Sequence, residues 1–332
     1  MSFFYKENPD LEEKLCRYFE GLSSFNDEHF GGTLSVVLLG SLSRGEGSWI
    51  NKDGGDILLS DIEFFTVYTD QNSDFEIFDR FVQSYAQEIL GDNISELFHV
   101  DNTYVSKTKI KTLEKKLLTF DAAFFGKCVV GEDVMPLFPK IDINNINLFD
   151  IRDILTHRAF YVLYYGSSLR NDDSKEEYRY LLAKNSLDLM TVLLVENGIL
   201  ESGFINRFEK IKTLNLPENI KKYFWYCLSV KLGRECEYEF TVEEMRKIFL
   251  DILKQARKDF KLRMPNIAVN FKSIARRQLG IIKRAVKYRH LVYSSHLSRL
   301  ISSIEKNEKI TQREIADNLV LNGYPVKWSL SL

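Results

Sequence analysis

The chain has 332 residues, which is long for one compact core and predicts two domains. Its 45% hydrophobic and 28% charged residues are those of a globular protein and exclude a disordered chain. No run of about 18 apolar residues occurs, and no basic segment followed by an apolar one opens the chain, so we expect neither membrane insertion nor a signal peptide.

The first 140 residues alternate between helical and strand patterns. Residues 9–28 carry apolar side chains at helical spacing, which predicts an amphipathic helix. Two apolar runs, TLSVVLLG at 33–40 and LLSDIEFFTVYT at 58–69, predict strands on either side of a polar loop rich in Gly and Ser. The later patterns predict a helix over 73–90, a strand over 95–106, a helix over 111–126 and a short strand over 127–131.

The pattern changes after Pro136 and Pro139, because nearly every later segment has a helical period. The longest of these segments predict helices over 176–198, 242–261 and 271–306. We therefore expect an α+β fold with a mixed-sheet core and flanking helices over residues 1–140, followed by an all-α helical bundle domain over residues 141–332.

The strand predicted over 58–69 carries two acids, Asp61 and Glu63, one residue apart. Side chains alternate between the two faces of a strand, so both acids point the same way while Ile62 and Phe64 point into a core. Two carboxylates on one face repel each other unless a positive charge neutralises them. Hard oxygen ligands at this spacing suit Mg²⁺, or Mn²⁺ in its place, shared with nucleotide phosphates.

The strand predicted over 33–40 ends in the dipeptide Gly40-Ser41. Glycine allows the backbone to turn sharply at a strand end, and the amides around this turn and the Ser41 hydroxyl can hold a phosphate. A Gly-Ser dipeptide alone is a weak signal, and so is an acid-x-acid pair. The order of strand, Gly-Ser, loop and acid-bearing strand is more specific than either.

Together these motifs resemble the DNA polymerase β-like nucleotidyltransferase superfamily, in which an hG[GS]…[DE]h[DE]h pattern carries the phosphate loop and two metal-binding acids. The matching residues are Gly40, Ser41, Asp61 and Glu63, and the resemblance covers roughly residues 10–135. Aminoglycoside or kanamycin nucleotidyltransferase-type members append a helical bundle to this core, as the later segments here do. The resemblance implies a nucleoside triphosphate as substrate and Mg²⁺ or Mn²⁺ as cofactor.

In that superfamily a later strand supplies a third acid, and the resemblance places it at Asp101, within the strand predicted over 95–106. The alternative for Asp101 is an exposed polar residue on an edge strand. Asp121 is a rival, but it falls in a predicted helix. The neighbouring His99 is interpreted as a half-buried histidine rather than as a base.

Two basic residues are candidates for contacts with phosphate. Related transferases place a lysine of the helical domain against the triphosphate, and Lys184 resembles it; the alternative is a surface lysine on an amphipathic helix. Arg44 follows the Gly-Ser turn and is either a phosphate contact or a solvated loop arginine. One departure concerns spacing: the gap from Gly40 to Asp61 is longer than is usual in the superfamily, and the extra residues predict a small hairpin or a lid.

The net charge of −2 hides an asymmetry. Residues 1–150 hold 13 Lys and Arg against 26 Asp and Glu, whereas residues 254–309 hold 15 against 3. The basic tract is either a solvated helix face that contacts the acidic domain or a surface for a phosphate-bearing partner. A small-molecule or sugar acceptor is favoured, because no nucleic-acid module is found, but the basic tract keeps a nucleic-acid acceptor open.

We therefore expect a metal-dependent nucleotidyltransferase that moves a nucleoside monophosphate from a nucleoside triphosphate to an acceptor and releases pyrophosphate. The alternatives are a catalytically silent nucleotide- or partner-binding module of the same fold and an oligomerising protein built from the helical half. The four cysteines are too scattered for a disulfide framework or a zinc site, so we expect a cytoplasmic protein. The expected catalytic and metal-binding residues are Asp61, Glu63 and Asp101, and the expected nucleotide-binding residues are Gly40, Ser41, Arg44 and Lys184.

Overall fold

The structure is a computed structural model that describes residues 2–263, apart from 53, 70–74, 96–97, 147–149 and most positions of 152–174. The chain divides into two compact units. The domain boundary expected near residue 140 stays a prediction, because compact units need not fold independently. The first unit comprises Met1–Asp150, Gly198–Asn215 and Leu228–Glu237, and the second comprises Ile151–Asn197, Leu216–Cys227 and Tyr238–Leu332.

The first unit is built on a four-stranded sheet with the strand order β5-β4-β1-β6. Strand β1 pairs antiparallel with β4 and with β6, whereas β4 and β5 are parallel, so the sheet is mixed. This sheet, together with the helices around it and the helical later part, confirms the expected α+β class. The strands are β1 (Ser35–Leu38), β4 (Ile62–Tyr68), β5 (Val100–Ser106) and β6 (Lys127–Val130).

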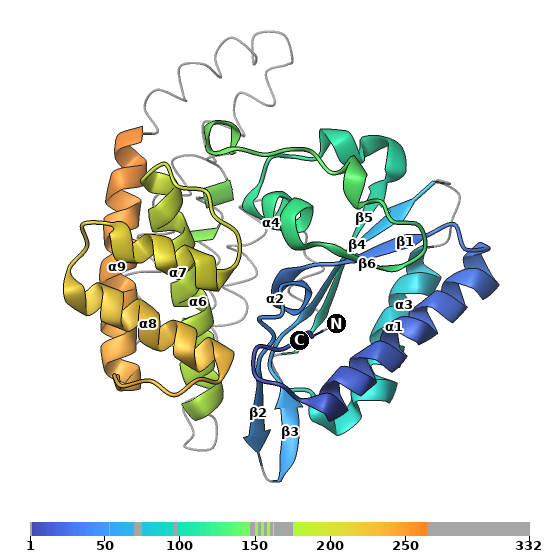
Figure 1. Ribbon diagram of the computed structural model, residues 1–332, viewed down its shortest axis with the longest axis horizontal. Helices are drawn as coiled ribbons and strands as arrows, with labels where there is room; N and C mark the ends of the chain where they lie inside the picture. Colours follow the sequence, from blue (N-terminus) through green and yellow to red (C-terminus); the bar gives the residue numbers. More distant parts are fainter. Residues whose placement is uncertain are drawn as a thin grey trace, which may run out of the picture. The chain divides into compact units, whose positions relative to one another are not determined.

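Helices cover both faces of this sheet. Figure 1 shows α1 and α3 side by side along one face, where Leu15 of α1 and Phe78 of α3 join Phe64 of β4 in one apolar core. On the other face, Ala122 of α4 packs with Val37 and Phe65 in a second core. Because the two central strands, β1 and β4, are covered on both faces, they are largely apolar, whereas the edge strand β5 is mostly polar. The helices are α1 (Pro9–Phe30), α2 (Gly40–Ser43), α3 (Phe75–Leu90) and α4 (Leu117–Phe125).

The long segment between Gly40 and Asp61 contains a two-stranded hairpin, as the sequence predicted. Strand β2 (Trp49–Lys52) pairs antiparallel with β3 (Gly55–Leu58). At the base of the hairpin the Leu59 amide donates a hydrogen bond of 2.9 Å to the Ser48 carbonyl. The hairpin therefore closes on itself and returns the chain to the start of β4.

The regular elements that the structure describes in the second unit are all helices. Helices α6 (Lys175–Glu196) and α9 (Val242–Arg263) confirm two of the predicted long helices. The buried Tyr223 hydroxyl lies 2.6 Å from the Ser186 hydroxyl and donates to the Met245 carbonyl over 3.1 Å, so its polar group is satisfied inside the unit. The helix predicted over 271–306 lies outside the described residues.

Two further helices complete this part of the chain. Helix α7 (Phe204–Thr213) belongs to the first unit, and α8 (Glu218–Leu232) begins in the second unit and ends in the first. Short 3₁₀ helices connect several elements of the first unit. They are η1 (Gly91–Asn93), η2 (Lys107–Thr112), η3 (Met135–Leu137) and η4 (Ile143–Asn145). Of the helices that the structure describes, none has the length and apolar character that crossing a membrane requires.

Candidate functional site

Three acids lie at or directly before the starts of β4 and β5. The parallel register pairs Glu63 of β4 with Asp101 of β5, and partners in a parallel pair point to the same face of the sheet. Asp61 lies directly before β4, and the His99 ring, which contacts Asp101, contacts Asp61 as well. Ile62 and Phe64 point to the opposite face, where both are buried in the apolar core, as the sequence predicted. The fold therefore brings the three predicted acids to one edge of one sheet face.

The His99 imidazole lies between two of these acids. Its Nδ1 atom is 3.0 Å from Oδ1 of Asp61, and its Nε2 atom is 3.0 Å from Oδ2 of Asp101. The backbone of His99 is fixed as well, because its carbonyl accepts a hydrogen bond of 3.1 Å from the Ile62 amide. The interpretation of His99 as half-buried is confirmed, since 38% of its side chain is exposed, but its role as a bridge between two candidate ligands was not predicted.

This position changes the acid–base behaviour of the histidine. Burial alone would lower the pKa of His99, but hydrogen bonds from its ring to Asp101 and Asp61, and the negative charges of both, raise the pKa to about 11. At neutral pH the ring is therefore a cation. Both ring nitrogens donate, because each contacts a carboxylate oxygen.

The Gly40 turn lies against the second acid. Gly40 begins the single helical turn α2 with a φ angle of +69°, a backbone conformation that favours glycine. A Cβ atom added at Gly40 would lie 2.6 Å from Oε2 of Glu63. Glycine is thus required at this position for two reasons: it adopts the backbone conformation of the turn, and it leaves room for the Glu63 carboxylate. This contact joins the Gly-Ser motif to the acid pair, which sequence spacing alone did not establish.

We expect Gly40→Ala to displace the Glu63 carboxylate and to lower transfer activity. The positive φ angle costs about 1–2 kcal/mol for any side chain, but the far end of Glu63 is flexible enough to move aside. Gly31→Ala is the matched control, because Gly31 has a φ angle of 58° and its added Cβ would meet nothing within 4 Å. Denaturant unfolding and transfer assays should show similar losses of stability in both variants and a loss of activity in Gly40→Ala only; equal activities would contradict the expectation.

A buried lysine lies beside the start of β4. Lys231, near the end of α8, is 1% exposed, and its ammonium donates hydrogen bonds to the hydroxyls of Ser48 (2.6 Å) and Ser60 (3.1 Å). Ser60 is also 3.1 Å from the Ser41 hydroxyl. A hydrogen-bonded chain thus connects Lys231 to the Gly-Ser turn. Sequence reasoning missed this lysine, because the apolar pattern of α8 does not distinguish it from a surface lysine.

Arg44 has its ionic partners within the protein. Its Nε atom is 2.7 Å from Oε2 of Glu46, and its Nη1 atom is 3.6 Å from Oδ2 of Asp121. Asp121 also binds Arg207 of α7 at 2.6 Å. The side chains of Arg44 and Arg207 are 7% and 3% exposed, and both guanidinium groups lie near the Phe204 ring. The Arg44 side chain is therefore buried rather than solvated, and a contact with phosphate remains a prediction.

Lys184 and Asp121, the rival to Asp101, belong to different units of the chain. Lys184 lies on α6 in the second unit, so its role against a triphosphate stays a prediction. Asp121 lies on α4, as its helical pattern predicted, and is engaged by two arginines. This arrangement accounts for Asp121 without a metal and leaves Asp101 as the acid on the neighbouring strand.

The candidate acids fit a divalent cation by their chemistry. Three carboxylates supply the hard oxygen atoms that Mg²⁺ and Mn²⁺ prefer. Within the described part of the chain, however, no three acidic, histidine or cysteine side chains converge as a metal site requires. The position of the His99 ring between Asp61 and Asp101 gives a physical reason for this, since it separates two of the carboxylates.

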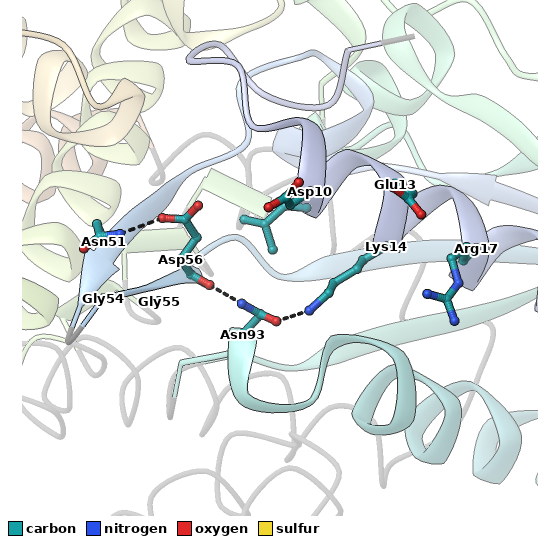
Figure 2. Close-up of a pocket in the computed structure, with 10 residues that line it drawn as sticks. Asp10, Glu13, Lys14, Arg17, Asn51, Gly54, Gly55, Asp56 and Asn93 are labelled. Atoms are coloured by element: carbon teal, nitrogen blue, oxygen red, sulfur yellow. Dashed lines mark hydrogen bonds between the residues drawn. The ribbon is translucent and has the colours of Figure 1, made fainter.

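A separate polar cavity of about 400 Å³ lies away from these acids, and Figure 2 shows the side chains around it. Helix α1, the tip of the β2–β3 hairpin and η1 line it. Asn93 connects its sides, because it accepts a hydrogen bond from the Lys14 ammonium and donates one of 2.7 Å to the Asp56 carbonyl. Its lining mixes both signs of charge, because α1 contributes the bases Lys14 and Arg17 and the acids Asp10 and Glu13.

No family model matches this chain, and no curated protein does. Among solved structures, the chain is similar to spectinomycin adenyltransferase AAD(9) from Enterococcus faecialis, in a crystal structure with ATP and spectinomycin. The TM-score is 0.45 and the sequence identity 13%, over 73% of this chain and 98% of the other. At this similarity neither a family nor an activity follows from the comparison.

Proposed function

We propose that this protein is a metal-dependent nucleotidyltransferase that transfers a nucleoside monophosphate from a nucleoside triphosphate to an acceptor hydroxyl or phosphate. The observation that carries the proposal is the pairing of Glu63 and Asp101 on one face of two parallel strands, with Asp61 linked to Asp101 through His99 and the Gly40 turn next to Glu63. A carboxylate cluster beside a glycine turn suits the binding of a metal and a polyphosphate together.

Each part of the cluster has a proposed task. The divalent cation would be held by Asp61, Glu63 and Asp101. It would neutralise the charge that develops during phosphoryl displacement. Asp101, whose side chain is a third exposed, would also accept the proton of an attacking hydroxyl. The backbone amides of the Gly40-Ser41 turn and the Ser41 hydroxyl would position the triphosphate. Arg44 and Lys184 remain proposed nucleotide contacts.

A small molecule or a sugar is the favoured acceptor. The sequence carries no recognisable nucleic-acid-binding module. The basic tract from Lys254 to Lys309 keeps an anionic acceptor, including nucleic acid, as the alternative. Most of this tract lies outside the described residues.

The test is a transfer assay with all four α-³²P-labelled nucleoside triphosphates, Mg²⁺ or Mn²⁺, and a panel of aminoglycoside, sugar and RNA acceptors. We expect labelled product and released pyrophosphate for at least one pair of nucleotide and acceptor, and no label transfer when a chelator removes the metal. Slow metal-dependent pyrophosphate release without an acceptor would also support the proposal. Absence of transfer and of pyrophosphate release with every nucleotide would contradict it.

One observation favours a second candidate, a nucleotide-binding module without catalysis. His99 bridges Asp61 and Asp101, so these acids are not arranged around a shared cation. Such a module would bind a nucleoside triphosphate without consuming it. Equilibrium dialysis with the same labelled nucleotides separates the two candidates, because binding without product or pyrophosphate identifies the silent module.

A further inference from the structure

The His99 ring lies between the carboxylates of two neighbouring strands, with each ring nitrogen 3.0 Å from one carboxylate oxygen. The two N–H bonds of an imidazole point to different sides of the ring. The ring therefore acts as a spacer as well as a hydrogen-bond donor. It keeps the contacted oxygens of Asp61 and Asp101 on opposite sides of itself.

A shared cation requires a different arrangement of the same oxygens. Mg²⁺ binds oxygen at about 2.1 Å, so two oxygens on one ion lie at most about 4.2 Å apart. Two oxygens that each contact a different edge of an imidazole ring at hydrogen-bond distance are further apart than this. The carboxylates of Asp61 and Asp101 thus cannot share one cation through these oxygens while the ring lies between them.

We propose that the His99 side chain is a built-in stand-in for the metal, occupying the space between Asp61 and Asp101 until a divalent cation displaces it. This proposal rests on the proposed function, because it takes Asp61 and Asp101 as metal ligands. It adds a regulatory element to the site. The His99 ring and the metal compete for the carboxylates of Asp61 and Asp101, so the metal binds only when the ring moves away.

The surroundings of the ring identify the part that moves. The His99 side chain is 38% exposed, whereas the Asp61 side chain is only 6% exposed and Asp61 directly precedes β4. The hydrogen bond from the Ile62 amide to the His99 carbonyl holds the backbone in register. Rotation of the histidine side chain toward solvent therefore opens the site without any change in strand pairing.

The test compares Mn²⁺ affinity at one fixed pH, measured by electron paramagnetic resonance, in the full-length protein and in His99→Gln. Glutamine is neutral and cannot bridge the two carboxylates as the ring does, so we expect Mn²⁺ to bind about tenfold more tightly, because two charge-assisted hydrogen bonds no longer oppose it. His29→Gln is the matched control, since His29 lies on α1 with 44% of its side chain exposed, and it should leave Mn²⁺ affinity unchanged.

A second measurement uses the unaltered protein and so does not depend on the folding of a variant. Addition of diamagnetic Mg²⁺ is followed by the ¹⁵N and ¹H signals of the histidine rings, assigned with His99→Gln or, if that variant does not fold, with His99→Asn. We expect the His99 ring signals to shift as Mg²⁺ saturates the site and those of His29 to stay in place. Saturable Mg²⁺ binding without a change at His99 would overturn the proposal.

The outcomes separate this proposal from the proposed function. If wild-type and His99→Gln proteins bound Mn²⁺ equally, His99 would be a spectator. If the variant bound Mn²⁺ more weakly, His99 would be a ligand. Either outcome would overturn the displacement proposal and leave the metal site intact. No Mn²⁺ binding in either protein would remove the metal site and the stand-in together. Binding in the variant alone would support the displacement proposal most strongly.

Discussion

Glu63→Gln is expected to lower the rate of nucleotidyl transfer by about 10³-fold. A metal ion contributes several kcal/mol to the stabilisation of a phosphoryl-transfer transition state, and each 1.36 kcal/mol corresponds to a tenfold change in rate, so about 4 kcal/mol gives this factor. Glutamine keeps the shape of glutamate but removes the negative charge that would hold the cation. The effect should appear in kcat more than in KM, because the lost interaction acts mainly in the transition state.

The fold should tolerate this change. Glu63 is partly buried and lies against the Gly40 turn, and a glutamine side chain occupies the same volume there. The measurement is the single-turnover rate with labelled nucleotide, accompanied by a thermal unfolding curve. Glu88→Gln is the matched control, since Glu88 is an exposed residue of α3, and its activity should equal that of the wild type. A folded Glu63→Gln protein with wild-type turnover would remove Glu63 from the catalytic machinery.

Asp121→Asn is expected to destabilise the protein by about 3 kcal/mol, because removal of one partner from a buried ion-pair network leaves the other charges uncompensated. Asp121 contacts Arg207 at 2.6 Å and Arg44 at 3.6 Å, and it accepts a hydrogen bond of 3.1 Å from the Ser202 hydroxyl. In the variant, Arg44 would still have its ion pair with Glu46. Arg207 would keep only its hydrogen bond of 2.8 Å to the Glu201 carbonyl among these contacts. Asparagine can replace part of the hydrogen bonding but none of the charge.

The free energy of unfolding in denaturant measures this loss. Glu132→Gln serves as the comparison, because its ion pair with Lys107 is open to solvent, with 68% of the Glu132 and 32% of the Lys107 side chain exposed, and such pairs contribute about 1 kcal/mol or less. If both variants lost the same small amount of stability, the network around Asp121 would be a peripheral feature. The expected large difference would show that the ion pairs of Asp121 stabilise the fold.

The sequence predicted most elements of the first unit, and the differences have local causes. The single strand expected over 58–69 is divided between β3 and β4, because the hairpin uses its first residue for pairing with Trp49. The helix expected over 111–126 begins only at Leu117, whose amide donates a hydrogen bond of 2.8 Å to Oδ2 of Asp150. Lys111 and Thr112 end the 3₁₀ helix η2 instead, and residues 113–116 belong to no helix. Neither partner could be found from periodicity.

The acids of the candidate site could be predicted because their signal is local. Alternation along one strand predicts Asp61 and Glu63 on one face; in the structure Glu63 lies in β4 and Asp61 directly precedes it. The role of His99 depends on the register between two strands that are far apart in the sequence, so no local pattern revealed it. The expectation that repelling carboxylates need an added cation was incomplete for this reason. The chain supplies a positive charge of its own between Asp61 and Asp101.

The hairpin base has a consequence for how the chain can change in length. The Leu59 amide and the Ser48 carbonyl are hydrogen bonded to each other. The segments before and after the hairpin are therefore held together at its base, however long the loop at its tip is. The distance in space between Gly40 and Asp61 therefore does not depend on the number of residues between them. Insertions at the hairpin turn, a peptide tag or a fluorescent domain among them, would lengthen the chain without separating the Gly-Ser turn from the acids. Spacing along the sequence is a weak criterion for this motif, and closure of the hairpin is the stronger one.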